Sequence, residues 1–174
     1  MKISNIRKYI EIYGESYLFK VIGPAVKEKG YFLFNEFYEV CMWKSARQKK
    51  RYIQNKNIIE EVSRKALAEE NERKKMEILS GELDGVGIPT ASALLTVVYP
   101  KRYAVIDIRC LEMLRKMKCD IGRHPSLNIW EKYLKIMREW SKENSITPRE
   151  LDMALFAMHR EDLNNQDYRN LRLW

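Results

Sequence analysis

Apolar residues recur along most of the chain at intervals of three and four, the spacing that places side chains on one face of an α-helix. This period predicts helices over residues 2–13, 15–29, 31–47, 57–80, 90–98, 108–117, 128–142 and 151–159. No stretch alternates apolar and polar residues as a half-buried strand does. We therefore expect an all-α fold of roughly eight to ten helices.

Breaks in this pattern mark the expected helix ends. Gly23-Pro24 kinks or divides the second helix, because proline lacks a backbone N–H. The segment around Asn71 is polar on every side, so we expect a break there, with lobes of residues 1–70 and 71–174 inside a single domain of residues 1–174. Thr147-Pro148 begins the last helix, and residues 161–174 show no clear period.

The most apolar helix, residues 90–98, carries apolar side chains on nearly every face and therefore belongs in the centre of the core. A turn with two glycines, Gly85-Val86-Gly87, comes shortly before it. Glycines let backbone N–H groups approach an anion, and the helix N-terminus at Thr90 adds a partial positive charge. The turn is thus a candidate phosphate site, and the simpler interpretation is an ordinary tight turn between helices.

The chain of 174 residues has a formal net charge of +8, which favours a polyanionic partner, nucleic acid ahead of an anionic membrane, or else a solvated basic surface. Five lysine and arginine residues lie in the eight positions from Lys44 to Arg51, beside Trp43 and Tyr52. Lys49, Lys50 and Arg51 fit a solvated helix end. Lys44 and Arg47 adjoin the apolar face and are better candidates to contact a phosphate backbone.

The cysteines, histidines and apolar segments argue against several classes of protein. Cys41, Cys110 and Cys119 lie far apart, which argues against a disulfide framework and against a four-cysteine zinc or iron–sulfur site. His124 and His159 are not at metal-ligand spacing. The N-terminus has no apolar core of a signal peptide, and no window has the roughly 20 apolar residues of a membrane span. We expect a soluble, cytoplasmic protein.

Asp107 follows a short apolar segment, residues 104–106, and precedes the helix of residues 108–117. Its position suits a helix N-cap, because aspartate accepts hydrogen bonds from first-turn N–H groups. It is also the nearest acid downstream of the apolar helix, so a catalytic carboxylate is the second interpretation.

The pattern Leu83-x-Gly85-Val86-Gly87-x-x-Thr90-Ala91, followed after the apolar helix by Asp107, resembles the helix–hairpin–helix DNA glycosylases of the HhH-GPD superfamily. The resemblance covers about 30 residues of this chain, from Ile78 to Arg109. Two further stretches, WKSAR at residues 43–47 and RELDMAL at residues 149–155, are similar to small 8-oxoguanine-glycosylase-like proteins.

The resemblance implies a two-lobed helical fold that acts on double-stranded DNA as a monomer and removes a damaged or modified base. Asp107 would activate the nucleophile or stabilise the oxocarbenium-like sugar. The hairpin amides would hold a phosphate, and Na⁺ or K⁺ would bind backbone carbonyl oxygens beside them. The DNA-binding residues would be Gly85, Val86, Gly87, Thr90, Arg109, Lys44 and Arg47, and the carbonyls those of Gly81, Leu83 and Val86.

Three departures from the family narrow the expected chemistry. Pro89 stands where bifunctional members carry a nucleophilic lysine, and proline cannot form the imine that leads to strand cleavage. We therefore expect a monofunctional enzyme that uses water, with Lys44 as the alternative nucleophile. Asp84 replaces a common proline and should weaken the phosphate site, unless it helps to hold a cation there. No iron–sulfur cluster is expected.

Two other functions fit the same sequence. One is a non-catalytic helix–hairpin–helix protein that binds DNA, and the other is a helical protein whose basic face meets a protein partner. An extruded base would need an aromatic side chain to stack on, and Trp43, Tyr38 and Trp174 are candidates. The base itself is not specified by the sequence.

Overall fold

The computed structural model describes residues 1–12 and 16–171, with side chains as far as residue 163. Within these ranges the chain forms ten α-helices and no strand, which confirms the all-α prediction. The helices are α1 (Ile6–Glu11), α2 (Gly23–Lys29), α3 (Phe34–Lys44), α4 (Lys49–Tyr52), α5 (Ile59–Ala68), α6 (Glu72–Glu82), α7 (Ile88–Val98), α8 (Ile108–Lys116), α9 (Leu127–Glu143) and α10 (Pro148–Leu171). Short turns of other helix types are η1 (Leu18–Ile22), η2 (Ala46–Gln48) and η3 (Ile53–Asn57).

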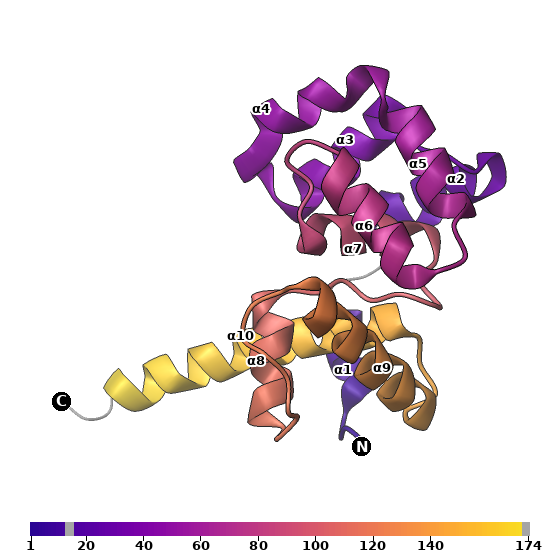
Figure 1. Ribbon diagram of the computed structural model, residues 1–174. Helices are drawn as coiled ribbons and strands as arrows, with labels where there is room; N and C mark the ends of the chain where they lie inside the picture. The colour runs from indigo at the N-terminus through magenta and orange to yellow at the C-terminus, as the bar shows by residue number, and fades with distance from the viewer. Residues whose placement is uncertain (13–15, 172–174) are drawn as a thin grey trace.

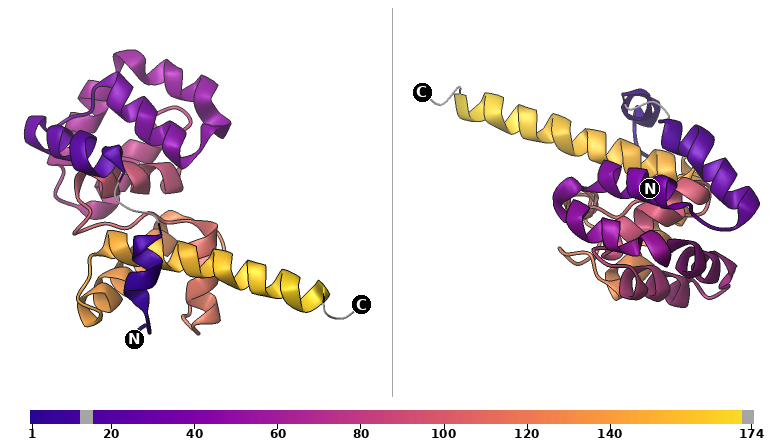
Figure 2. Two further views of the ribbon diagram at one scale, coloured as in Figure 1. Left: turned by 180° about the vertical axis from the view of Figure 1, so that it is seen from behind. Right: turned by 90° about the horizontal axis from the view of Figure 1, so that it is seen from above.

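The helices form two groups, one above the other in Figure 1. The upper group contains α2 to α7, and the view from behind in Figure 2 shows the same separation. α7 lies at its centre, because α2, α3, α6 and η1 all pack against it. Every residue of α7 from Thr90 to Val98 is buried, as the apolar pattern of this helix predicts.

The lower group contains α1, α8, α9 and α10, so the first helix of the chain lies with the last three. α10 contacts α1, α8 and α9 along its first half, and its C-terminal half projects beyond the group (Figures 1 and 2). The segment of residues 99–107 carries the chain from α7 in the upper group to α8 in the lower one.

The break expected near Asn71 is present, but it does not separate the two groups. Asn71 is the N-cap of α6, and its side-chain oxygen accepts a hydrogen bond from the amide of Lys74 at 3.0 Å. α5 and α6, on either side of this cap, pack against each other within the upper group. The two groups therefore differ from lobes divided at residue 70.

Several helix ends differ from the sequence prediction, and the structure gives the reason for two of them. α3 ends at Lys44, because Ser45 adopts an extended conformation and its carbonyl accepts a hydrogen bond from the hydroxyl of Tyr52 at 3.1 Å. α10 continues to Leu171, well past residue 159, since no proline or glycine follows Pro148 to interrupt it. Its start is as predicted, with Thr147 and Glu150 forming reciprocal capping hydrogen bonds.

Among the described residues, the helices that are long enough to cross a membrane are too polar to do so.

Candidate functional site

A cavity of about 360 Å³ lies where the two groups of helices meet. Its walls come from the end of α3, the segment before α8, the start of α8 and the first turns of α10. We call it the Asp107 cavity, and it is lined by Trp43, Lys44, Val105, Asp107, Arg109, Cys110, Arg149, Asp152, Met153 and Phe156. Ligand pockets in proteins typically measure about 300–1,000 Å³, so the cavity has room for one heterocyclic base.

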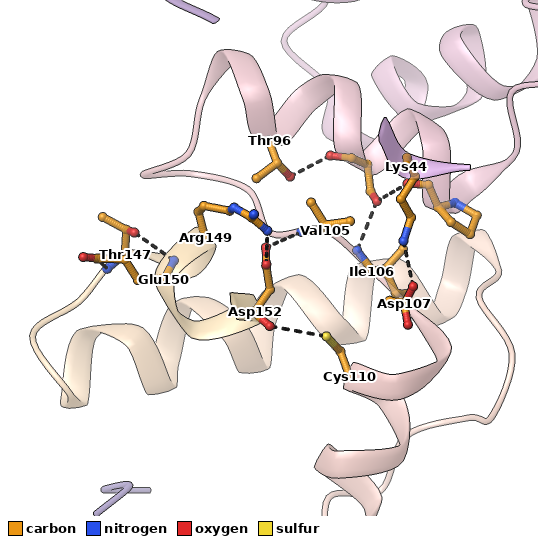
Figure 3. Close-up of polar contacts among 12 residues, drawn as sticks. Lys44, Thr96, Val105, Ile106, Asp107, Cys110, Thr147, Arg149, Glu150 and Asp152 are labelled. Atoms are coloured by element: carbon orange, nitrogen blue, oxygen red, sulfur yellow. Dashed lines mark hydrogen bonds and ion pairs between the residues drawn. The ribbon is translucent and has the colours of Figure 1, made fainter. Parts of the chain in front are cut away.

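Asp107 has two contacts at the edge of this cavity. One carboxylate oxygen accepts the amide of Arg109 at 2.9 Å, which makes Asp107 the N-cap of α8. The other accepts a hydrogen bond from Nζ of Lys44 at 2.8 Å (Figure 3). The capping role predicted for Asp107 is therefore confirmed, and the same side chain lines the cavity.

Three buried polar side chains form hydrogen bonds with the backbone of the two residues that precede Asp107. The amide of Val105 donates to the carboxylate of Asp152 at 2.7 Å, and the carbonyl of Val105 accepts from the hydroxyl of Tyr133 at 2.9 Å. The amide of Ile106 donates to the hydroxyl of Ser92 at 3.1 Å. Buried backbone groups need such partners, so these contacts fix the conformation of the segment that ends at Asp107.

The pKa of Asp107 lies below its ordinary value. Partial burial acts to raise this pKa, but the charge and hydrogen bond of Lys44 and the amide of Arg109 outweigh it. The Lys44 side chain is 12% exposed and that of Asp107 is 26% exposed, so the pair is shielded from water without being sealed off. At neutral pH the cavity therefore presents a carboxylate beside an ammonium group.

A second pair, Arg149 and Asp152, lines the same cavity. The two residues are three apart on α10, and Nη1 of Arg149 donates to Asp152 (Figure 3). Asp152 is 3% exposed, and burial raises its pKa to about 6 against the opposing effects of Arg149 and the Val105 amide. The guanidinium of Arg149 lies over the rings of Phe19, at 4.5 Å, and Trp43, at 5.4 Å.

Aromatic rings form two walls of the cavity. Trp43 is 42% exposed and contacts Phe19 edge-on, with ring centroids 5.8 Å apart. On the opposite element, α10, Phe156 packs beneath the guanidinium of Arg109 at 4.9 Å. A planar ligand that enters the cavity would meet these ring surfaces.

The hairpin between α6 and α7 forms a second hollow, which we call the hairpin hollow. It is lined by Gln48, Arg51, Ser80, Gly81, Glu82, Leu83, Asp84, Gly85, Val86 and Gly87. Gly85 has a φ of +78°, and a Cβ there would lie 2.9 Å from the Cβ of Arg51, so only glycine fits. Gly87 is the N-cap of α7, where the first amides of the helix lack intrahelical partners.

Two residues of the upper group hold this hairpin in place. The fully buried Asn55 accepts the amide of Asp84 at 2.7 Å and donates to the carbonyl of Asp84 at 2.9 Å. Arg51 forms an ion pair with the carboxylate of Asp84 at 2.6 Å. The negative charge that the sequence places beside the phosphate site therefore has a cation against it.

The three residues predicted to offer carbonyl oxygens to a monovalent cation lie at the same hollow. Gly81, Leu83 and Val86 all line it, and α6 ends there at Glu82, so the negative end of the helix dipole faces the hollow. No three side chains of His, Cys, Asp or Glu in the described part of the chain cluster closely enough to hold a metal ion. Backbone carbonyls are therefore the donors that such an ion would use.

One short stretch connects the two hollows. Lys44 lines the Asp107 cavity and Gln48 lines the hairpin hollow, four residues further on. Their Cα atoms are thus at most about 14 Å apart. Successive phosphates of one DNA strand advance about 3.4 Å along the helix axis, so this separation corresponds to at most about four nucleotides.

The structure brings together part of the residue set predicted from sequence. Lys44, Asp107 and Arg109 share one cavity, and Gly85, Val86 and Gly87 share the hairpin hollow. The side chain of Thr90 is buried, so only its amide remains at the helix N-terminus. Arg47 is exposed on η2, between the two sets of lining residues.

Of the three aromatic residues predicted to stack on an extruded base, one lines the cavity. Trp43 lines the cavity, whereas Tyr38 packs against Phe34 with ring centroids 5.7 Å apart. Trp174 lies outside the described residues.

Sequence reasoning did not assign Arg149, Asp152 or Asn55 to a site. A signal for Asp152 was present, because it is a single acid among the apolar residues Leu151, Met153, Ala154 and Leu155. An isolated carboxylate on a buried helix face needs a buried partner. For Asn55 we find no comparable signal in the sequence.

The chain was compared with models of protein families, with curated proteins and with solved structures, and none of the three comparisons found a match.

Proposed function

We propose that this protein is a DNA glycosylase that excises a damaged or modified base from double-stranded DNA, with Asp107 as its catalytic carboxylate. The observation that carries the proposal is the Lys44–Asp107 pair, 2.8 Å apart, at a base-sized cavity, with Gln48 of the hairpin hollow only four residues after Lys44. A target base must leave the stack before its glycosidic bond can be reached, and the cavity offers it a place.

The hairpin hollow would hold the DNA backbone. Amides at Gly85, Gly87 and the start of α7 can donate to a phosphate, and the helix dipole favours the negative charge. A Na⁺ or K⁺ ion on the carbonyls of Gly81, Leu83 and Val86 would add a positive charge beside that phosphate. In this proposal a single copy of the chain binds the duplex.

The lowered pKa of Asp107 favours electrostatic stabilisation over proton removal, because a weakly basic carboxylate is a poor proton acceptor. As the bond between C1′ and the base breaks, the electron pair leaves with the base and positive charge develops on the sugar. The carboxylate stabilises this charge. A water oxygen then bonds to C1′, and the proton lost by the water ends on the departing base.

The proposal is tested by incubating the protein with duplexes that each carry one lesion, and measuring released base by mass spectrometry. Oxidised, deaminated and alkylated bases should all be included. Asp107→Asn should slow release by about 10²–10³-fold and retain duplex binding, because asparagine also caps helices. Asp120→Asn is the matched control, because the Asp120 side chain is fully exposed and its contact with Lys132 is a long one, at 3.7 Å.

The nucleophile is decided separately. Pro89 provides no amine, and the Nζ of Lys44 is engaged in a hydrogen bond to Asp107, so we expect water to attack. The alternative is attack by the Lys44 amine, which the 2.8 Å contact places at the reaction site. Borohydride reduction of the reaction mixture traps an imine only in the second case, and Lys44→Met would remove the trapped adduct.

The second candidate function is a non-catalytic DNA-binding protein that uses the hairpin alone. It is favoured if duplex binding is salt-dependent and is lost in Gly87→Glu, while no duplex in the panel releases a base.

A further inference from the structure

Arg149 lies in the Asp107 cavity, and the proposed chemistry gives it no task. Its guanidinium packs over Phe19 and Trp43 of the upper group, and Nη1 donates to Asp152. Its Nε is buried and has no hydrogen-bond partner among the residues that the structure describes. A buried polar group without a partner costs free energy, so the guanidinium is in a position to gain from an added acceptor.

We infer that Arg149 recognises the extruded base by donating hydrogen bonds to an acceptor on the edge of its ring. The inference rests on the proposed function, because it assumes that a base enters this cavity. A guanidinium carries five N–H donors and no acceptor, and it pairs with carbonyl oxygens and unprotonated ring nitrogens of bases. Arg149 would thus select bases by the hydrogen-bond acceptors on their edges.

The depth of the side chain distinguishes a base from a phosphate as its ligand. Arg149 has a side chain that is 15% exposed, and its partner Asp152 is 4% exposed. Arg109, also in the cavity lining, is exposed at the start of α8. A phosphate remains near solvent when its nucleotide is extruded, so it would meet Arg109, while the base reaches Arg149.

Asp152 fixes the direction of the guanidinium. Its second oxygen is held by the amide of Val105 at 2.7 Å, on the same segment that carries Asp107. The recognition group and the proposed catalytic carboxylate are therefore connected through two residues of backbone. A base that binds Arg149 is placed at a fixed distance from Asp107.

The charges of the cavity narrow the class of base. The lining contains three cations, Lys44, Arg109 and Arg149, and two carboxylates, Asp107 and Asp152. Each carboxylate is already paired with a cation, which leaves one positive charge in excess. A neutral base that offers a carbonyl oxygen or ring nitrogen fits this field, whereas a cationic N-alkylated purine is repelled.

The test measures binding, so that it does not depend on catalysis. Asp107→Asn protein is titrated with duplexes that differ at one mispaired position, and each dissociation constant is divided by that for an abasic-site duplex. The purine series is guanine, 7-deazaguanine, 2-aminopurine and 7-methylguanine. The pyrimidine series is uracil, 2-thiouracil and 4-thiouracil, in which one carbonyl at a time is a weaker acceptor.

In the Asp107→Asn protein, which retains Arg149, one base of each series lacks the acceptor that Arg149 recognises. For that base the ratio of dissociation constants should rise roughly tenfold to a hundredfold. Adding Arg149→Met should cause the same loss for the intact base, and no additional loss for the base that lacks the acceptor. The cationic 7-methylguanine should bind more weakly than guanine. Arg51→Met, at the hairpin, should weaken all duplexes alike.

The inference is overturned if Arg149→Met leaves every ratio of dissociation constants unchanged, or raises all of the ratios equally in both series. An equal loss, with a lower melting temperature, would show that Arg149 only joins the two groups of helices. If Arg149→Met does not fold, Arg149→Lys keeps the cation without the planar fork and should retain only part of the selectivity. Base release by the unmodified protein is scored separately, so an inactive protein can still pass or fail this test.

Discussion

Replacing Lys44 with methionine tests the electrostatic arrangement of the cavity without reference to any substrate. The Lys44–Asp107 contact is 2.8 Å long, with side chains 12% and 26% exposed. Hydrogen bonds to charged groups contribute about 1.5–3 kcal/mol, and partial exposure reduces this to about 1–2 kcal/mol. Methionine preserves most of the aliphatic packing. We expect Lys44→Met to lower the free energy of unfolding at pH 7 by that amount, or the melting temperature by roughly 2–8 °C.

The effect should depend on pH in a specified direction. The pKa of folded Asp107 lies below its ordinary value of 3.8, so the folded state binds fewer protons than the unfolded chain in acid. The contribution of the pair is therefore complete above that value and is lost as pH falls through the folded pKa. The difference between Lys44→Met and the unmodified protein should shrink accordingly in acid.

Urea denaturation at a series of pH values measures this difference directly. Lys132→Met is the control, because Lys132 is 60% exposed and lies 3.7 Å from the fully exposed Asp120. It should change the free energy of unfolding little at any pH. A loss of stability in Lys44→Met that is equal at every pH, or absent at pH 7, would refute the reasoning about this pair.

Three further predictions concern the residues that hold the site. Burial raises the pKa of Asp152 to about 6, so stability should fall as pH rises from about 4 to 6, and urea titrations of Asp152→Asn should lack that slope. Gly85→Ala should destabilise by at least about 1–2 kcal/mol through its positive φ and its contact with Arg51, whereas Gly87→Ala, with 3.8 Å to the nearest atom, should be close to neutral by calorimetry. Asn55→Ala removes both hydrogen bonds to Asp84 and should cost about 2–4 kcal/mol in the same measurement, while a near-neutral result would show that the hairpin holds itself.

The sequence predicted those features that depend on local pattern. The apolar period of α7 indicated its central burial, and Asp107 at the start of α8 is a cap as its residue type suggests. The end of α3 was misplaced because Ser45 is fixed by Tyr52, seven residues away, and no local propensity reports that contact. α10 was predicted too short because a helix without breakers continues even where its apolar period fades.

The site depends on contacts that local pattern does not contain. Lys44 and Asp107 are 63 residues apart, and Val105 and Asp152 are 47 apart. Lys44 could be named as a candidate because it adjoins the apolar face of its helix, yet its contact with Asp107 requires the two groups of helices to meet. The pairing of Arg51 with Asp84 likewise changes the expectation that Asp84 weakens the phosphate site, because a cation now lies against it.

The measurement that tests the central claim most directly is the single-turnover rate of base release by the unmodified protein and by Asp107→Asn. The substrate is the duplex from the lesion panel that releases base fastest. If Asp107 stabilises the developing charge on the sugar, the substitution should slow release by about 10²–10³-fold with duplex binding unchanged. Equal rates for the two proteins, or no release from any duplex by the unmodified protein, would contradict the account.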